Sequence, residues 1–147
     1  MRLIQLTLVL VTFGVIVSGH ARADEATRTA TLYKNPQCTC CDAYADYLRP
    51  HGFEITVTPT HDLSLIKAKH GVPAALQGCH TMLIDGYVIE GHVPLGPLNK
   101  LLTERPTIEG ISLPGMPLGS PGMAGLKRGP FTIYEISGEP LKVYAVE

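Results

Sequence analysis

The sequence predicts a single α/β domain followed by an irregular C-terminal extension. Short apolar segments alternate with helical segments over residues 29–106, whereas Gly and Pro crowd residues 113–123. Removal of the first 23 residues, which have the pattern of a signal peptide, leaves 124 of the 147 residues. That length suits one compact domain with its own core.

The first 23 residues have the pattern of a secretory signal peptide. Arg2 precedes an apolar run over residues 3–17, and Ala21 and Ala23 form an A-x-A cleavage site. The apolar run is shorter than the about 20 residues that span a bilayer. We therefore expect cleavage after Ala23, a periplasmic mature protein and no membrane association after cleavage.

The charge balance gives no indication of a nucleic-acid partner. Two of the twelve basic residues lie in the signal segment, which leaves ten basic and thirteen acidic residues in the mature chain. The resulting net charge of −3, counted from those ten and thirteen with neutral His, is mildly acidic. Nucleic-acid binding is therefore not expected.

The first half of the domain reads as strand, helix, strand, helix. Strands are predicted over residues 29–33 and 53–58, a helix over residues 42–49, and a short helix from Asp62 toward Gly71. This order implies a parallel strand pair joined by a right-handed crossover.

The second half adds a hairpin and a third helix. Residues 81–84 and 87–90 read as strands on either side of the turn dipeptide Asp85-Gly86. A helix is predicted to begin near Pro94 and to end before Pro106.

The order of these elements is typical of a thioredoxin-like fold. A C-x-x-C spacing, from Cys38 to Cys41, falls between the first strand and the first helix. The helix dipole and its free N–H groups stabilise thiolates at that position. We therefore assign residues 24–106 to a thioredoxin-like domain.

The remaining residues, 107–147, form the extension. Residues 113–123 hold too many helix and strand breakers for regular structure. A final β-hairpin is predicted from residues 131–136 and 141–146. We expect the extension to pack on the same domain and to contribute to a metal site.

Three of the four cysteines, Cys38, Cys40 and Cys41, lie within four residues. Neighbouring cysteines form a disulfide only with strain, whereas crowded thiolates select Cu(I), Zn(II) or an iron–sulfur centre. Cys79 lies just before the predicted third strand and is expected to face this cluster. The alternatives are two structural bridges and a buried free Cys79.

Met116 and Met123 stand in the Gly- and Pro-rich stretch, with few apolar neighbours to pack against. Thioether sulfur is a soft ligand that favours Cu(I), so both are candidate copper ligands. Met82, inside an apolar strand, is expected in the core. Thiolates together with loop methionines favour copper over zinc in an oxidising compartment.

The histidines are weaker candidates. His80 follows Cys79 directly, so its side chain is expected to point the other way if the strand has begun, and His92 is expected to be solvated in a turn. Whether either one ligates is left open. His51, His61 and His70 are expected on the surface.

In its motifs, the chain resembles the periplasmic copper-resistance proteins of the CopG type. The matching segments span nearly the whole mature chain: residues 32–34 and 38–41, His51-Gly52-Phe53-Glu54, Gly71-Val72-Pro73, Gly78-Cys79-His80-Thr81, Asp85-Gly86-Tyr87, Glu90-Gly91-His92-Val93-Pro94, Gly115-Met116-Pro117 and Pro121-Gly122-Met123. The resemblance implies a thioredoxin-like domain whose C-terminal extension helps to hold a cysteine-bridged multinuclear copper cluster. It also implies interconversion of Cu(I) and Cu(II) alongside copper export, hence partnership with periplasmic export components. The implied ligands are Cys38, Cys40, Cys41, Cys79, Met116 and Met123.

Three functions remain open from the sequence. The first is a copper-binding protein of copper resistance with a multinuclear Cu(I) site, redox active or not. The second is a thiol–disulfide oxidoreductase that uses Cys38 and Cys41 as its catalytic pair, and the third is a passive copper store or chaperone. Cys40 argues against the second, because an additional thiol in a redox loop invites mispairing. A monomer is the default expectation.

Overall fold

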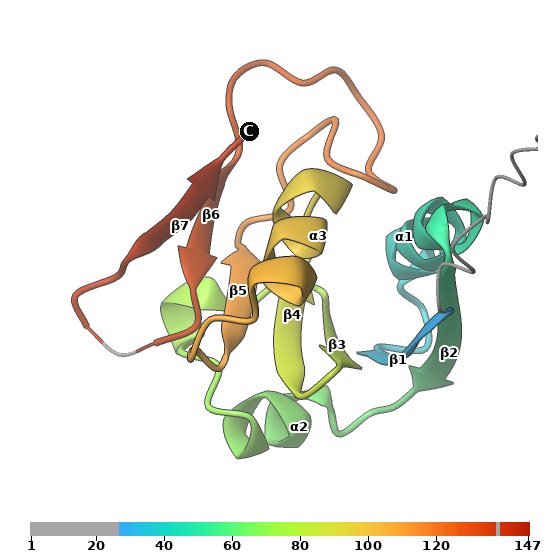
Figure 1. The fold of residues 1–147 in the computed structure, drawn as a ribbon. Coiled ribbons are helices and arrows are strands. Elements are labelled where there is room, and N and C mark those ends of the chain that lie inside the picture. The colour runs from blue at the N-terminus through green and yellow to red at the C-terminus, as the bar shows by residue number, and fades with distance from the viewer. Residues whose placement is uncertain (1–26, 138) are drawn as a thin grey trace, which may run out of the picture.

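The computed structural model describes residues 27–137 and 139–147. The predicted signal peptide and its cleavage site lie outside these residues. The described chain forms one mixed sheet of seven strands in the order β2-β1-β3-β4-β5-β6-β7 (Figure 1). The strands are β1 (Arg28–Lys34), β2 (Phe53–Pro59), β3 (His80–Ile84), β4 (Tyr87–Gly91), β5 (Gly110–Leu113), β6 (Thr132–Glu135) and β7 (Val143–Val146).

The helices connect these strands much as the sequence predicts. They are α1 (Thr39–Leu48), α2 (Leu63–Lys69) and α3 (Leu95–Glu104), with short 3-10 turns at Arg49–His51 and Ala74–Leu76. None of the helices described is long and apolar enough to span a membrane. Gly52, at φ 83°, ends the first 3-10 turn in the left-handed conformation that glycine adopts most readily.

The pairing of the strands explains which strand ends lie next to each other. β1 runs parallel to β2 and antiparallel to β3, and β3 runs antiparallel to β4. In the β1–β3 register, Lys34 lies opposite His80. The residues that follow β1 and the residues that precede β3 therefore lie side by side at the same end of these two neighbouring strands.

The alternation of side chains divides the core between the two faces of the sheet. Met82 and Ile84 belong to a large cluster with the buried residues of α1 and α3. Leu83 and Val88 point to the other face and pack with Val72, which follows α2. Met82 is fully buried, as predicted.

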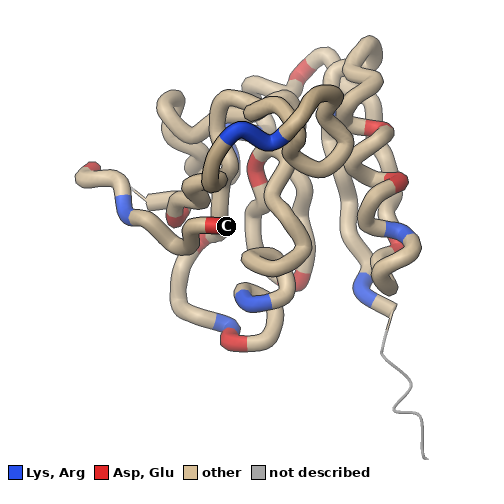
Figure 2. Tube along the Cα trace, turned by 90° about the horizontal axis from the view of Figure 1, so that it is seen from above, with Lys and Arg blue, Asp and Glu red and all other residues tan. Residues whose placement is uncertain are grey.

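The extension continues the sheet, because β5, a strand that the sequence analysis did not predict, precedes the Gly- and Pro-rich stretch. β5 pairs in parallel with β4, β6 runs antiparallel to β5, and β7 runs antiparallel to β6. The loop between β5 and β6 carries the Gly- and Pro-rich segment back toward α1 (Figure 1). Figure 2 shows charged residues scattered over the described chain rather than gathered on one element.

Candidate metal centre

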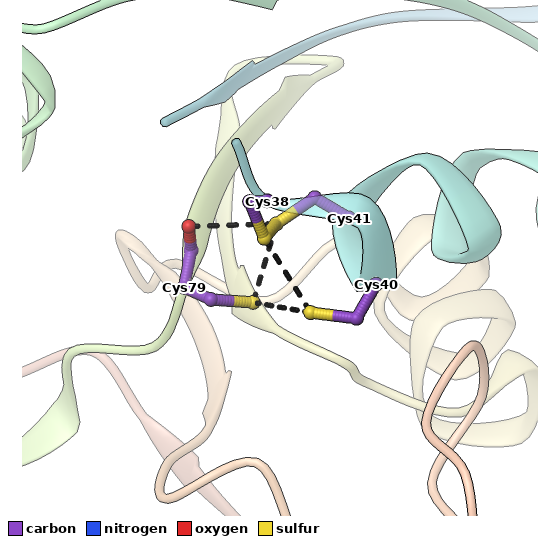
Figure 3. Close-up of side chains that lie close together, drawn as sticks. All are labelled: Cys38, Cys40, Cys41 and Cys79. Atoms are coloured by element: carbon purple, nitrogen blue, oxygen red, sulfur yellow. Dashed lines mark hydrogen bonds between the residues drawn. A yellow bond between two sulfur atoms is a disulfide. The ribbon is translucent and has the colours of Figure 1, made fainter. Parts of the chain in front are cut away.

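The four cysteines converge where β1, α1 and β3 meet. Cys38 is the residue before α1, so Cys40 and Cys41 lie in the first helical turn. Cys79 directly precedes β3, and its side chain faces the other three cysteines (Figure 3). The four Sγ atoms all lie within 4.8 Å of one another, and only Cys41 is fully buried. This group therefore offers four sulfurs to one point in space.

Two of these cysteines are joined and two are free. Cys38 and Cys41 form a disulfide with Cα atoms 5.5 Å apart, whereas Cys40 and Cys79 carry free thiols. Cys40 Sγ lies 3.4 Å from Cys38 Sγ, and Cys79 Sγ lies 3.4 Å from Cys41 Sγ. The two free sulfurs are 3.9 Å apart. Each free thiol thus rests against one sulfur of the bridge.

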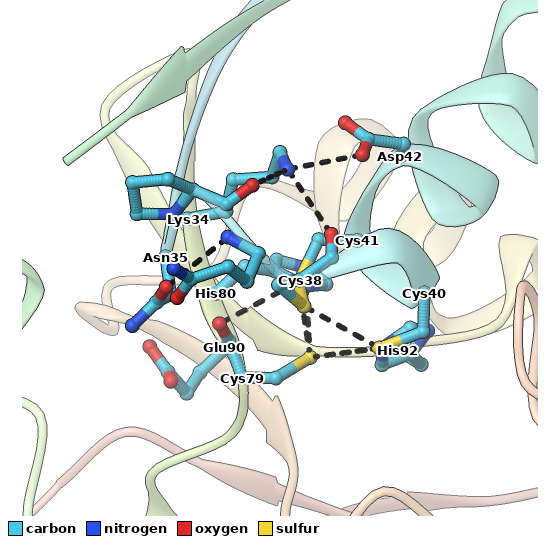
Figure 4. The surroundings of a disulfide bond; sticks show 12 residues. Lys34, Asn35, Cys38, Cys40, Cys41, Asp42, Cys79, His80, Glu90 and His92 are labelled. Carbon is cyan, nitrogen blue, oxygen red and sulfur yellow. Dashed lines mark hydrogen bonds and ion pairs between the residues drawn. A yellow bond between two sulfur atoms is a disulfide. The ribbon is translucent and has the colours of Figure 1, made fainter.

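A buried lysine, which the sequence analysis missed, holds the cysteine loop. The Lys34 ammonium donates to the carbonyl oxygens of Cys38 (3.1 Å) and Pro36 (3.4 Å) and pairs with Asp42 at 3.0 Å (Figure 4). The signal for it is the strand alternation, because Ala30, Leu32 and Lys34 are buried on alternate positions of β1.

A second buried cation fixes the segment that carries Cys79. Lys67 and Glu90 form a fully buried ion pair, and the same carboxylate accepts hydrogen bonds from the Gly78 N–H (2.7 Å) and the Thr81 hydroxyl (2.8 Å). Lys67 also donates to the carbonyl oxygen of His80 at 3.4 Å. Burial raises the pKa of Glu90, an effect opposed by Lys67 and these donors.

Close backbone packing holds the same segment against the end of β4. A Cβ atom built on Gly78 would lie 2.7 Å from the Cα of Gly91. Gly91 itself has φ 72°, in the left-handed region that favours glycine. The two glycines therefore let Cys79 and His92, which follow them, lie together.

His80 and His92 both lie beside Cys79, which corrects the sequence interpretation. His80 does not point away from Cys79, because its Nδ1 lies 3.5 Å from the Cys79 Sγ. His92 is not solvated, since it is fully buried with Nε2 3.0 Å from the same sulfur. Cys79, His80 and His92 thus form a second group of candidate ligands. His51 and His61 are exposed and His70 is half-buried.

Burial sets the protonation of the groups at the site. Loss of solvent, together with the neighbouring Cys40, raises the pKa of the Cys79 thiol to about 12. Burial also lowers the pKa of His92 and holds the pKa of His80 well below its usual range. In the metal-free protein at neutral pH, Cys79 is therefore a thiol and both imidazoles are neutral.

The two methionines differ in their surroundings. Met116 is 39% exposed and has φ 45°, on the outer part of the loop. Met123 is half-buried and follows two residues that contact the domain. The carbonyl oxygen of Pro121 lies 2.6 Å from His92 Nδ1, and Gly122 packs against the backbone of Tyr44. The assignment of both methionines as ligands remains a prediction.

The fold and the site define an α/β protein with a cysteine-rich group capable of binding a soft metal. Comparison with solved structures takes this further. The chain is similar to "Copper resistance protein copG- Form 2", with 34% identity and a TM-score of 0.74 over 82% of this chain and 98% of that one. It is equally similar to "Copper resistance protein copG- Form 1", with 35% identity and a TM-score of 0.73 over 81% and 96%. The chain belongs to the family of copper resistance protein CopG.

Residues 76–123 also match a family model described as "Protein of unknown function, DUF411". This match includes Cys79, both site histidines and both loop methionines. No curated protein sequence matches the chain.

Proposed function

We propose that the protein is a periplasmic copper-binding protein of copper resistance that holds Cu(I) in a cysteine-bridged, multinuclear site. The observation that carries this proposal is the convergence of four Sγ atoms within 4.8 Å. Thiolate is the donor that selects Cu(I) over hard cations. Membership of the CopG family supports copper as the metal.

The donor set fits several copper ions better than one. A thiolate is able to bridge two metal ions. Four sulfurs this close together can therefore be shared between several copper ions. Cys38, Cys40, Cys41 and Cys79 are the proposed core ligands, with Met116 and Met123 as additional soft ligands. Binding then requires reduction of the Cys38–Cys41 bridge and loss of the Cys79 proton.

The same cysteines support interconversion of Cu(I) and Cu(II). Reduction of the Cys38–Cys41 disulfide to two thiolates consumes two electrons, and oxidation of two Cu(I) ions to Cu(II) supplies two. One disulfide therefore matches two copper ions. Each bridged sulfur has one free thiol 3.4 Å away, so copper held by that thiol would lie next to the disulfide.

A thiol–disulfide oxidoreductase is the second candidate, because Cys38 and Cys41 already form a bridge at the start of a helix. The free thiol of Cys40 argues against this candidate, because its Sγ lies 3.4 Å from Cys38 Sγ and would compete with Cys41 for the bridge. We therefore rank copper binding first.

We also propose the finer assignments that go with this function. Residues 24–106 form a thioredoxin-like domain and residues 107–147 an extension that packs on it and ends in a hairpin. Cleavage after Ala23 releases the mature chain, a monomer, into the periplasm, where copper-export components are its partners.

A paired assay on Cys40→Ser separates the candidate functions. If Cys40 bridges metals, the variant loses more than one Cu(I) per protein relative to wild type when both are reduced and loaded without oxygen. Reduction of insulin disulfides, which needs only Cys38 and Cys41 in a dithiol enzyme, is the second measurement. Full copper loading together with strong insulin reduction by the variant would favour the oxidoreductase.

A further inference from the structure

Exposed apolar side chains gather in the loop between β5 and β6, which runs above α3 toward α1 and returns (Figure 1). Met116, Leu118 and Leu126 are 39%, 55% and 83% exposed. They are half of the six large apolar side chains that are exposed within residues 27–137 and 139–147. Single exposed apolar residues need no explanation, whereas a group of them indicates an interaction surface.

The loop is an ordered platform, because its two limbs pack on each other. A Cβ atom built on Gly119 would lie 2.3 Å from the backbone nitrogen of Lys127, and one built on Gly125 would lie 3.2 Å from the Leu118 Cβ. The Gly119 N–H also donates to the carbonyl oxygen of Ala124 at 3.3 Å. The fold therefore holds the exposed leucines of this loop at the surface instead of burying them.

A groove of about 270 Å³ lies between these limbs and the start of β6. Its apolar lining is formed by Pro117, Leu118, Leu126, Pro130 and Phe131. Pockets that enclose small molecules begin at about 300 Å³, so this groove suits one large apolar side chain of a partner better. A bilayer has no side chain to fill a hollow, which favours a protein partner over a membrane.

Two basic residues stand beside this groove. Lys127 and Arg128 are the only charged residues between positions 110 and 131, and both are exposed. Neither forms an ion pair with any residue of the described chain. Arg128 lines the groove, and the Lys127 ammonium lies 4.5 Å from the centre of the Phe131 ring. A partner that complements these two charges carries acidic residues.

We propose that this groove is the docking surface for a partner protein that inserts a large apolar side chain flanked by Asp or Glu. An apolar centre with a charged rim is the usual arrangement of such interfaces. The loop that forms the groove also carries Met116 and Met123. A docked partner would therefore lie beside the proposed copper ligands, a consequence that rests on the proposed function, whereas the docking surface itself does not.

Synthetic peptides test the docking surface on the metal-free wild-type protein. The probe carries Phe and Leu flanked by Asp and Glu. One control peptide has Ser in place of Phe and Leu, and the other has Lys in place of each acidic residue. Amide shifts in the ¹⁵N NMR spectrum should be confined to residues 117–131, and both control peptides should bind at least about fivefold more weakly. Absence of shifts in this segment, or equal binding of the Lys peptide, overturns the proposal.

Variants of the groove give a second measurement. Lys127→Glu combined with Arg128→Glu should weaken binding of the acidic probe at least about tenfold. Leu126→Ser should weaken it at least about fivefold. The amide spectrum of each variant shows whether the fold is retained, and the wild-type peptide series stands without them. An affinity within about threefold of wild type after either change in a folded variant overturns the proposal.

Matched control residues lie outside the groove. Leu65 is 67% exposed on α2, and Lys69 and Lys142 are exposed with no ion pair in the part of the chain that the structure describes. Leu65→Ser should bind the probe as wild type does. Lys69→Glu combined with Lys142→Glu makes the same change in net charge as the double groove variant and should also leave binding unchanged. Equal weakening by this pair would reduce the effect to net charge and overturn the docking surface.

Other occupants of the groove are outcomes of the same test. Wild-type protein that sediments with phosphatidylglycerol vesicles but shows no shifts with the probe would place a membrane on this surface. A dimer that Leu126→Ser dissociates would place a second copy there, and either result overturns the proposal. Cu(I) retention by reduced wild-type protein is measured separately: its loss overturns the proposed copper function, whereas the peptide results decide the docking surface.

Discussion

The Lys67 ammonium and the Glu90 carboxylate form an ion pair that is buried directly beneath the segment carrying Cys79. The pair also binds the Gly78 N–H and the His80 carbonyl, so it fixes the backbone on both sides of this cysteine. The metal centre is thus supported by buried charges that do not themselves contact the sulfurs of the cluster.

Glu90→Gln should therefore destabilise the protein strongly. The change leaves Lys67 charged and unpaired in the core, which costs on the order of 3–5 kcal/mol. Urea unfolding of the metal-free protein measures this loss. Asp85→Asn, which disrupts the exposed Asp85–Arg105 pair, is the control and should change stability by about 1 kcal/mol or less. Equal effects of the two changes would contradict a structural role for the buried pair.

Gly122→Ala should separate the extension from α1. The added Cβ would lie 2.6 Å from the backbone nitrogen of Tyr44, and the residue has φ 77°. We expect a loss of about 1–3 kcal/mol from overpacking and weaker copper retention, because Pro121 no longer holds His92. Gly115→Ala is matched in φ, also 77°, but meets nothing within 4 Å. If both variants retain copper equally, the packing of the extension does not matter to the site.

Met116 and Met123 are expected to act as soft ligands on a lid. Changing both to Leu preserves apolar volume and removes the thioether, so the melting temperature of the metal-free protein should stay near that of wild type. Retention of Cu(I) against a competing chelator should fall. Unchanged retention with reduced stability of the metal-free protein would instead identify the two residues as packing groups.

The buried histidines predict that stability falls in mild acid. Their folded pKa values lie below the unfolded value of about 6.5, so the unfolded chain binds more protons in that range. Stability is therefore lost as the pH falls below about 6.5, by up to about 1.4 kcal/mol per pH unit for each histidine. The raised pKa of Glu90 acts with the opposite sign, so that its stabilising effect fades as the pH rises.

Comparing wild type with His80→Gln cancels the contribution of Glu90. Chemical unfolding of the metal-free protein at several pH values should give a shallower loss below pH 6.5 for the variant. His61→Gln should behave as wild type. Identical slopes for His80→Gln and wild type would show that His80 is not held neutral by the fold.

Local sequence patterns predicted most of the elements around the site. The β3–β4 turn follows from Asp85-Gly86, and the helix after the cysteines follows from its helix formers. β5 was missed because Gly110–Leu113 is only four residues long and owes its strand conformation to pairing with β4. At Gly110 an added Cβ would lie 1.8 Å from the Val88 carbonyl oxygen, so this glycine serves a long-range contact.

The site was predicted only in part, because some of its contacts join residues far apart in the sequence. Crowding of Cys38, Cys40 and Cys41 is visible in the sequence, and so is the position of Cys79 before a strand. Alternation suggested that His80 points away from Cys79, yet Cys79 precedes β3 and the rule does not apply across that boundary. The burial of Lys67 and Glu90 depends on their pairing across 23 positions, which no local pattern reveals.

Copper stoichiometry tests the central claim most directly. The wild-type protein is reduced and loaded with Cu(I) in the absence of oxygen, freed of excess metal, and analysed for copper, protein and reactive thiols. We expect more than one copper ion per chain and four cysteines protected from thiol reagents until the metal is removed. One copper ion or none per chain, with the thiols still reactive, would contradict a cysteine-bridged multinuclear site.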